Sequence, residues 1–274
     1  MQTLHIGYMA ENMQIKINPA SSLNKIIDSY IFRSVNVDAG FPINKLMPCR
    51  HTSSIDFFLG DEYKTTDLQT KNTIPFARCT IRGPRTYKKY EISLKGNFKS
   101  FSIRFKSTGI HQLLGIPMHN FTNEATDASL VNPLLFNEII SRLLECSNSI
   151  SCISVVEPYF LKILSSSRPV KITVDKLADI LAKPFDFITS SYNCQLTQRQ
   201  IERNFIKEIG INPKLYSSLN RFENVLSQKI LHPEKKWTEL AYDNRFFDQM
   251  HLIKDFHRFL GIKPSGFCAS QFAF

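Results

Sequence analysis

Residues 248–265, DQMHLIKDFHRFLGIKPS, nearly repeat residues 197–214, TQRQIERNFIKEIGINPK. Aligned without a gap, the two segments share identical residues at Gln198/Gln249, Phe205/Phe256, Gly210/Gly261, Ile211/Ile262 and Pro213/Pro264. Other aligned positions keep an apolar or a basic side chain in both copies. The repeat predicts that this chain forms the same short helix twice.

Each copy carries its own signals for the start and the end of a helix. Thr197 and Asp248 are residue types whose side-chain oxygen accepts a hydrogen bond from the free amides of a first helical turn. Gly210 and Gly261 stand where the chain must leave the helix, which favours a left-handed backbone. A proline follows shortly after each glycine and prevents the helix from continuing.

Both predicted helices have one apolar face and one polar face. Ile201, Phe205 and Ile209 recur every fourth residue, and the aligned residues of the second copy are also apolar, so this face is expected to be buried. The exposed face of the first copy consists of Gln198, Arg199, Glu202 and Arg203. The exposed face of the second copy consists of Gln249, Met250, His251, Ile253 and Lys254.

The polar face of the first copy has side chains suited to reading DNA. In a helix-turn-helix, the N-terminal residues of the second helix contact base edges in the major groove. Arginine pairs bidentately with guanine, and glutamate accepts a hydrogen bond from cytosine N4. The exposed side chains of the second copy are less suited to such pairing with bases. The alternative is that both are ordinary solvated faces of amphipathic helices. That alternative would be favoured for either helix alone, and the repeat weakens it.

The segment between the copies predicts a connecting helix. In residues 213–231, PKLYSSLNRFENVLSQKIL, apolar residues alternate by three and four positions. A helix of this length spans ~27 Å. It could hold two recognition helices near the ~34 Å that separates successive major-groove faces. We therefore expect the two copies to address adjacent major grooves of one duplex.

With their flanks, the two copies resemble a known family. Residues 196–216, LTQRQIERNFIKEIGINPKLY, and 237–267, WTELAYDNRFFDQMHLIKDFHRFLGIKPSGF, are similar to the DNA-binding domain of the AraC/XylS transcription regulators. The resemblance covers roughly 173–267 and implies an all-α domain with two helix-turn-helix units joined by a helix. It also implies that Arg199, Glu202 and Arg203 hold base-contacting positions, and that the five residues named above occupy the corresponding stretch of the second recognition helix.

Two positions depart from the family pattern. The turn before the second recognition helix usually carries Gly-Phe and here reads Arg245-Phe246, which predicts a non-glycine residue at positive φ at a cost of ~1 kcal/mol. In the first unit, Ser190-Ser191 replace a usual Leu-Ala pair. We therefore expect the first unit to be looser than is typical of the family.

Upstream of these units, the sequence predicts strands and then helices. Segments 54–60, 90–94 and 100–105 are rich in aromatic and β-branched residues, whereas 133–145 and 154–166 show helical periodicity, the latter kinked or started at Pro158. Residues 82–131 resemble the N-terminal domain of an AraC-type subgroup, which implies a cupin-like β-barrel followed by helices. Segment 165–170 is the expected linker. The predicted fold is multidomain α+β, with a cupin-like sensor or oligomerisation domain at 1–168 and the double helix-turn-helix domain at 169–274.

Composition limits the class of protein further. A hydrophobic content of 43% with 22 phenylalanines predicts well-packed cores, and a net charge of +10 suits nucleic acid or an acidic membrane without distinguishing them. Six cysteines without a C-x-x-C pair indicate reduced thiols in a cytoplasmic compartment. No run of eighteen apolar residues occurs, so we expect neither secretion nor a membrane-spanning helix.

Sequence motifs give no support to an enzyme. His5, His51, His111 and His119 lack the spacing of a metal cluster, and neither a phosphate loop nor a nucleophile elbow occurs. We expect no metal, no cofactor and no catalytic residues. Arg82, Arg85, Lys88 and Lys89 form a basic cluster that could meet an anionic ligand or DNA, although a solvated loop is favoured. The aromatic residues of 41–105 could line a cavity, but a barrel core is favoured.

The leading hypothesis is a cytoplasmic transcription regulator that binds specific double-stranded DNA sequences. A small-molecule effector in the N-terminal domain and a homodimer are further candidates, and no membrane partner is expected. The alternative is an AraC-type scaffold that acts as a protein-interaction module with weak or no specific DNA binding, because Met250 and Ile253 are apolar. An enzyme is a distant third.

Overall fold

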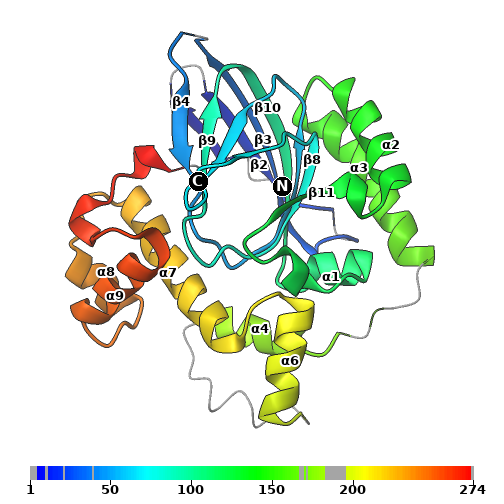
Figure 1. The fold of residues 1–274 in the computed structure, drawn as a ribbon. Coiled ribbons are helices and arrows are strands. Elements are labelled where there is room, and N and C mark those ends of the chain that lie inside the picture. Colours follow the sequence, from blue (N-terminus) through cyan, green and yellow to red (C-terminus); the bar gives the residue numbers. More distant parts are fainter. Residues whose placement is uncertain are drawn as a thin grey trace.

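The computed structural model shows a β-rich N-terminal region followed by a helical C-terminal region (Figure 1). This arrangement confirms the predicted fold class. The residues that the structure describes are 5–9, 12–20, 22–38, 40–166, 170, 172–182 and 196–272. Ser190 and Ser191, on which the expectation of a looser first unit rested, and much of the expected linker at 165–170 lie outside them.

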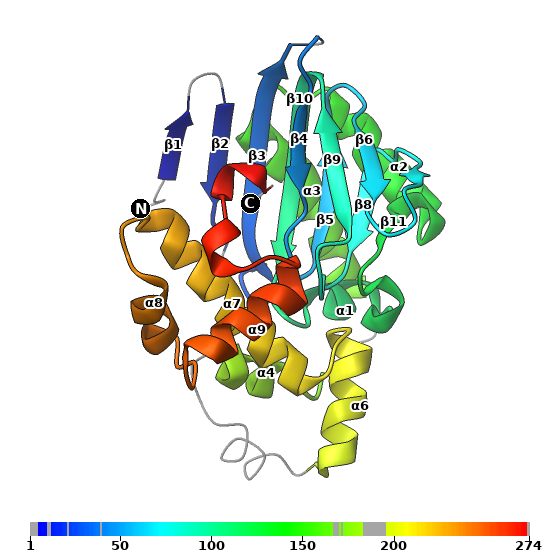
Figure 2. The same ribbon diagram turned by 60° about the vertical axis from the view of Figure 1, so that its left-hand side comes forward.

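Two antiparallel sheets that face each other form the N-terminal region (Figures 1 and 2). The larger sheet has the order β1-β2-β3-β10-β5-β8-β11, with bounds His5–Met9, Asn12–Ile17, Ile27–Val37, Gly96–Phe105, Ser54–Phe58, Cys79–Arg82 and Ala125–Asp127. The smaller sheet has the order β4-β9-β6-β7, with bounds Ile43–Leu46, Tyr90–Leu94, Lys64–Asp67 and Thr73–Ile74. The strands predicted at 54–60, 90–94 and 100–105 are thus confirmed as β5, β9 and β10, whereas β11 was not predicted.

Side chains alternate between the two faces of the larger sheet, as the pleat of a strand requires. On the outer face of β10, three aromatic or aliphatic side chains are fully buried: Phe101, Ile103 and Phe105. On its inner face, polar and charged side chains point into the space between the sheets: Ser100, Ser102 and Arg104. The larger hydrophobic core of this region therefore lies outside the two-sheet interior, and a smaller apolar cluster lies between the sheets.

Helices cover the outer face of the larger sheet and complete that core. They are α1 (Gly109–Leu114), α2 (Pro133–Leu144) and α3 (Ser149–Ser166), with the short 3₁₀ turns η1 (Met118–Phe121) and η2 (Ala128–Leu130). The predicted helix at 133–145 is confirmed as α2. The helix predicted at 154–166 is confirmed as α3, which begins earlier than expected, at Ser149. Of the two alternatives for Pro158, a helix start is wrong, because the proline lies inside α3. Cys152, Val156 and Phe160, spaced by four, are fully buried, and this packing outweighs the cost of an internal proline.

The C-terminal region consists of helices around a separate core. Its elements are α4 (Asp175–Ala182), α6 (Gln198–Glu208), α7 (Pro213–Leu231), α8 (Trp237–Asp243), α9 (Gln249–Leu260), η3 (Pro264–Gly266) and η4 (Ala269–Gln271). The connecting helix predicted at 213–231 is confirmed as α7. Asn212 caps it by accepting from the Leu215 amide at 2.9 Å, and Pro213 occupies its first turn, where no amide is needed.

Hydrogen bonds join the helical region to the barrel. Nδ1 of His51 lies 2.7 Å from Oε1 of Glu223 on α7, and the Lys88 amide donates to the carbonyl of Phe259 near the end of α9 at 3.0 Å. Burial acts to raise the pKa of the Glu223 carboxyl, but His51 and Arg50 outweigh burial and hold that pKa below its ordinary value. The barrel therefore contacts α7 directly and the C-terminal end of α9.

A C-terminal segment returns from the helices to the barrel. Phe272 is buried, forms a parallel bridge with Leu46 of β4 and lines the space between the sheets. Its ring stacks on Phe267 at 5.6 Å, and the Phe267 ring contacts Trp237 edge-on at 5.8 Å. A row of aromatic rings thus runs from the barrel interior to α8.

The expectation of a solvated loop at the basic cluster of residues 82–89 is wrong for its two arginines. Arg82 and Arg85 are only 8% and 6% exposed. Nε of Arg82 lies 3.2 Å from Oδ2 of Asp56, and Nε of Arg85 donates to the carbonyl of Pro48 at 2.8 Å. The second sheet covers these side chains, which the sequence of one strand does not reveal.

Candidate nucleic-acid interface

The helix expected to be the first recognition helix, α6, begins at a complete capping box. The Gln200 amide donates to Oγ1 of Thr197 at 3.3 Å, and Oε1 of Gln200 accepts from the Thr197 amide at 2.8 Å. This reciprocal pair satisfies two backbone donors at the helix start. The predicted cap at Thr197 is confirmed, so the N-terminal turn of α6 is a defined structure.

The structure places all four predicted residues of α6 on its exposed side, whereas Ile201 and Phe205 are fully buried. Nε2 of Gln198 donates to Oε1 of Glu202 at 3.1 Å. Across the described parts of the chain, no hydrogen bond or ion pair is found for the side chain of Arg199 or Arg203. The two guanidinium groups, four residues apart on the helix, are therefore available to an external partner.

The C-terminal end of α6 is fixed against the barrel. Gly210 has φ of 104°, and its carbonyl accepts from Oγ1 of Thr122 at 2.7 Å. A Cβ at this glycine would lie 2.8 Å from that oxygen and 2.9 Å from the carbonyl of Met118. The position therefore requires glycine both for its backbone conformation and for its close approach to η1.

Glu208 clamps α6 to α4. Its carboxylate, on a residue only 3% exposed, accepts from the Thr173 amide at 3.0 Å, from Oγ1 of Thr173 at 2.6 Å and from the Val174 amide at 3.2 Å. These donors immediately precede α4, so the carboxylate also lies at the positive end of that helix. Sequence reasoning did not identify Glu208.

In the second unit, the turn between α8 and α9 has the predicted strain. Arg245 has φ of 55°, which confirms the expected non-glycine residue at positive φ. The Phe246 amide donates to the carbonyl of Ala241 at 2.9 Å and so closes the end of α8. Asp248 then caps α9 by accepting from the His251 amide at 2.7 Å. Gly261, with φ of 68°, ends α9 as predicted.

The five predicted residues of α9 are not equally accessible. Gln249 and Lys254 are exposed, and Met250 is 58% exposed, whereas Ile253 and His251 are half-buried. The structure thus leaves three of the five side chains free to meet a large partner.

His251 belongs to a network within the domain. Its Nε2 lies 3.3 Å from a guanidinium nitrogen of Arg221 on α7, and its ring meets Phe246 edge-on at 5.2 Å. The Arg221 guanidinium stacks 4.4 Å above the Phe246 ring and lies 3.8 Å from the Asp255 carboxylate. Burial raises the pKa of Asp255. A carboxylate on the buried face of an amphipathic helix was the available signal for this network, and sequence reasoning missed it.

Exposed apolar residues surround the start of α9. Phe247 is 92% exposed and Tyr242 is 84% exposed. Met250 lies nearby, in the first turn of α9. Sequence reasoning identified only the methionine. Large aromatic side chains that are this exposed often mark contact surfaces.

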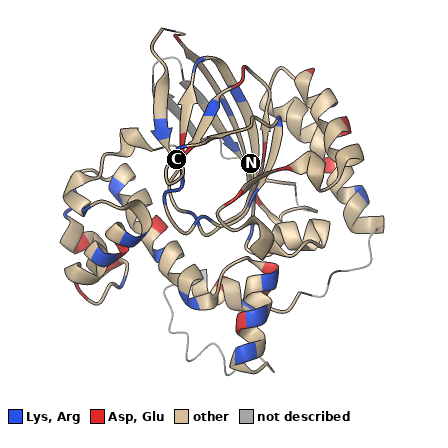
Figure 3. Ribbon diagram, viewed as in Figure 1, with Lys and Arg blue, Asp and Glu red and all other residues tan. Residues whose placement is uncertain are grey.

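The two recognition helices pack at different points along α7. Phe205 of α6 meets Tyr216 near the start of α7 at 5.9 Å, whereas Phe256 and Phe259 of α9 meet Phe222 at 5.0 and 5.1 Å. Figures 1 and 2 show that α6 and α9 run in different directions. Figure 3 shows Lys and Arg along both helices.

Comparisons with known proteins give a partial match. Residues 15–127 match the family model described as a domain of unknown function, DUF6597. No curated protein matches the chain. Among the described residues, no helix is long and apolar enough to cross a bilayer.

Solved structures give distant similarities. ToxT from Vibrio cholerae O395 has 10% identity and a TM-score of 0.45, covering 86% of this chain and 95% of its own. Unsaturated fatty acid-bound ToxT from strain SCE256 has 12% identity and a TM-score of 0.44, covering 86% and 93%. FeII HppE matches 38% of this chain and 56% of its own, with 11% identity and a TM-score of 0.27.

Proposed function

We propose that this protein is an AraC-type transcription regulator that binds specific sequences in double-stranded DNA. The observation that carries the proposal is the N-terminal half of α6. There a complete capping box presents Arg199 and Arg203 on an exposed helical face without partners in the described chain. We assign residues 1–168 to the sensor or oligomerisation domain and residues 169–274 to the DNA-binding domain.

The chemistry of α6 suits direct reading of bases. A guanidinium group donates two parallel hydrogen bonds to O6 and N7 of guanine, which discriminates by about 1–3 kcal/mol against the wrong base. Glu202 can accept from cytosine N4, with Gln198 already bonded to it and holding its position. Exposed lysines and the free amides of the helix start would meet phosphates and set the register.

The second recognition helix contributes less to base discrimination. Gln249 and Lys254 are its exposed polar groups, and Met250 can touch a thymine methyl but cannot form a bidentate pair. His251 supports the helix through Arg221 instead of facing outward. We therefore expect a sharply defined half-site under α6 and a degenerate, A·T-tolerant half-site under α9.

The directions of the two helices set a condition for binding. Because α6 and α9 are not parallel, a straight duplex cannot present equivalent groove geometry to both helices at once (Figure 2). Engagement of both half-sites therefore requires a bent duplex or a rotation of α6 about the segment 210–212. The hydrogen bond from Thr122 to Gly210 opposes that rotation.

A second function has a specific observation in its favour. Phe247 and Tyr242 expose large aromatic surfaces beside Met250, as expected of a protein-interaction module on an AraC-type scaffold. Such a module would bind specific DNA weakly or not at all. The two functions therefore differ in a directly measurable way.

Selection of bound sequences from random duplex DNA by the full chain tests the proposal. We expect an enriched motif with one sharp half-site, and an affinity that falls steeply as salt rises because phosphate contacts release counterions. A base-by-base substitution scan of the motif then locates the sharp half-site. If no motif is enriched and the affinity is insensitive to salt, the interaction-module alternative holds.

A further inference from the structure

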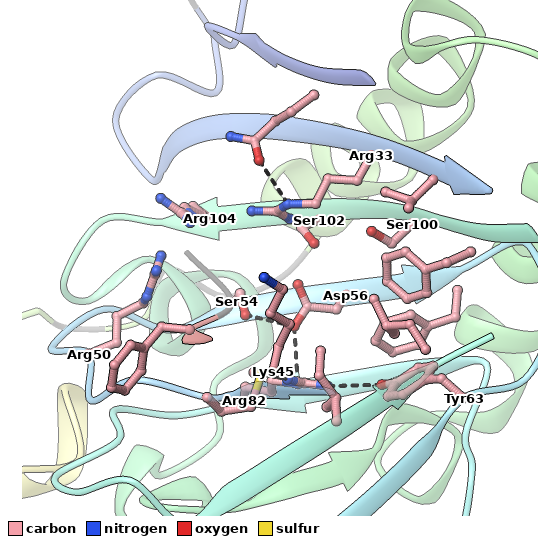
Figure 4. A pocket seen from close by; sticks show the side chains of 18 of the residues that line it. Arg33, Lys45, Arg50, Ser54, Asp56, Tyr63, Arg82, Ser100, Ser102 and Arg104 are labelled. Carbon is pink, nitrogen blue, oxygen red and sulfur yellow. Dashed lines mark hydrogen bonds and ion pairs between the residues drawn. The ribbon is translucent and has the colours of Figure 1, made fainter. Parts of the chain in front are cut away.

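The space between the two sheets contains a cavity of about 290 Å³ (Figure 4). Strands of both sheets line it, and Phe272 of the C-terminal segment closes part of its boundary. The volume is close to the lower end of the range for small-molecule sites, ~300 Å³.

The lining of the cavity is strongly cationic. Six basic side chains face it, namely Arg33, Lys45, Arg50, Arg82, Arg85 and Arg104. Among the described residues of the lining, Asp56 is the one carboxylate. It is held by Arg82 at 3.2 Å and by a hydrogen bond from Oγ of Ser54 at 2.9 Å. Glu223, behind the lining, is a second carboxylate close enough to attract Arg85 and Arg104. Two carboxylates still cannot balance six cations, so the described site carries excess positive charge.

Two of these cations form no side-chain hydrogen bond or close ion pair within the described chain, and their nearest counter-charge outside the lining is the Glu223 carboxylate. Nε of Arg50 is buried and has no hydrogen-bond partner, and no side-chain hydrogen bond or ion pair is found for Arg104 across the described parts of the chain. By contrast, Arg82 is committed to Asp56 and to the Tyr63 hydroxyl at 3.1 Å. Unpaired cations in a covered site are costly, so their retention indicates an external counter-charge.

The cations also repel one another. Burial, together with the nearby guanidinium groups of Arg50 and Arg33, lowers the pKa of Arg104. Burial and the guanidinium groups of Arg50 and Arg82 likewise lower the pKa of Arg85. Burial and mutual repulsion lower both pKa values despite the attraction of Asp56 and Glu223, so an anion placed among these groups would favour their charged forms.

The other end of the cavity is apolar. Phe58, Phe98, Ile92 and Leu94 line it, and Tyr63 lies beside Phe58 with ring centroids 4.7 Å apart. A ligand that fits both ends has a compact charged part and a small carbon framework. The Ser100 hydroxyl, which also lines the cavity, can donate to an oxygen atom of such a ligand, whereas the Ser102 hydroxyl is already bonded to Asp56.

We propose that this cavity binds a small organic molecule with two or more anionic oxygen groups, either phosphates or carboxylates. Arg50 and Arg104 hold these groups, and the aromatic end accommodates the carbon framework. The inference concerns the barrel alone and holds whether or not the helical region binds DNA.

Titration of the purified full chain tests the proposal, with pyrophosphate and citrate as probes of the two chemistries. Calorimetry gives the affinity, and a thermal melt gives the change in Tm. Sodium chloride at matched ionic strength controls for screening, and octanoate controls for a single charge on an apolar chain. We expect pyrophosphate, citrate or both to raise Tm saturably, while sodium chloride and octanoate do not.

Two variants locate the site. Arg104→Gln and Arg50→Gln should each weaken binding at least tenfold, whereas Arg142→Gln, on the exposed surface of α2, should bind like the parent. Without ligand, Arg104→Gln should melt at the same temperature as the parent or higher, because it removes a repelled cation. A purely structural arginine would instead lower Tm when replaced.

Three results would overturn the inference. The first is a parent protein that neither pyrophosphate nor citrate stabilises beyond matched salt. The second is stabilisation by octanoate alone, and the third is undiminished affinity for both probes in both arginine variants. Binding of pyrophosphate alone or citrate alone would support the site and identify its preferred group.

Discussion

Glu208 offers a sharp test of how the first helix-turn-helix unit is held together. Its buried carboxylate accepts from three donors, the Thr173 amide, the Thr173 hydroxyl and the Val174 amide. Glu208→Ala removes the acceptor and leaves the donors in place. Each buried donor without a partner costs about 1–3 kcal/mol, and water can reach part of half-buried Thr173. We therefore expect a loss of about 2–4 kcal/mol in the free energy of unfolding.

Urea unfolding followed by far-UV circular dichroism measures this loss, and hydrogen–deuterium exchange locates it. Glu208→Gln keeps one carbonyl acceptor and should lose about half as much. Glu202→Ala, on the exposed face of the same helix, is the matched control and should change stability by no more than about 0.5 kcal/mol. Exchange should rise first in residues 172–182, because the clamp holds the start of α4.

A loss below about 1 kcal/mol in Glu208→Ala would show that the carboxylate does not stabilise α4 as its hydrogen bonds indicate. Equal losses in the alanine and glutamine variants would show that side-chain volume matters and the acceptor does not. If α4 does position α6 for DNA, the alanine variant should also lose affinity chiefly at the sharp half-site. Uniform weakening on all sequences would contradict that link.

Three further predictions concern single residues. Arg199→Ala and Arg203→Ala should each weaken binding to the selected site by about 1–3 kcal/mol and relax the preference at one base position. Lys207→Ala, in the last turn of α6, should not alter base preference. Unchanged affinity in both arginine variants would contradict the assignment of these arginines to base contacts. Arg245→Gly should raise the unfolding free energy by up to ~1 kcal/mol by relieving its positive φ, and a clear fall in Tm would show that its side chain has an essential partner. Glu223 has a lowered pKa in the folded state, so the stability that its carboxylate contributes is complete above the ordinary glutamate pKa of about 4.3 and is lost as pH falls through the folded value. The difference in urea midpoint between the parent and Glu223→Gln should therefore shrink in acid. A constant difference would rule out the ionised carboxylate as its source.

Local signals account for what the sequence predicted in the helical region. Helix-capping residues, helix-ending glycines and the spacing of apolar residues act within a few residues of the chain. Thr197, Asp248 and Gly261 therefore identified α6 and α9 without knowledge of any tertiary contact. The positive φ at Arg245 was expected from the family resemblance, because the family usually has glycine at this position of the turn. The capping residues, the glycines and the apolar spacing, in contrast, are properties of the segment itself.

The parts that could not be predicted depend on distant segments. In β5 and β10, alternating polar residues are consistent with a solvated face, and only the second sheet turns that face into a covered cavity. Pro158 suggested a helix start, yet the packing of its neighbours on the larger sheet extends α3 past it. The Glu208 clamp likewise joins two helices through residues far apart in sequence. In each case tertiary contacts overrode a local signal.

The row of aromatic rings has a practical consequence. Trp237 is the single tryptophan of the chain, and it is linked through Phe267 to Phe272, whose ring lines the cavity. A molecule that displaces the Phe272 ring would alter the surroundings of the Trp237 indole two rings away. A change in Trp237 fluorescence would therefore report a displacement of the Phe272 ring without an added label. Trp237 begins α8, the helix that precedes α9.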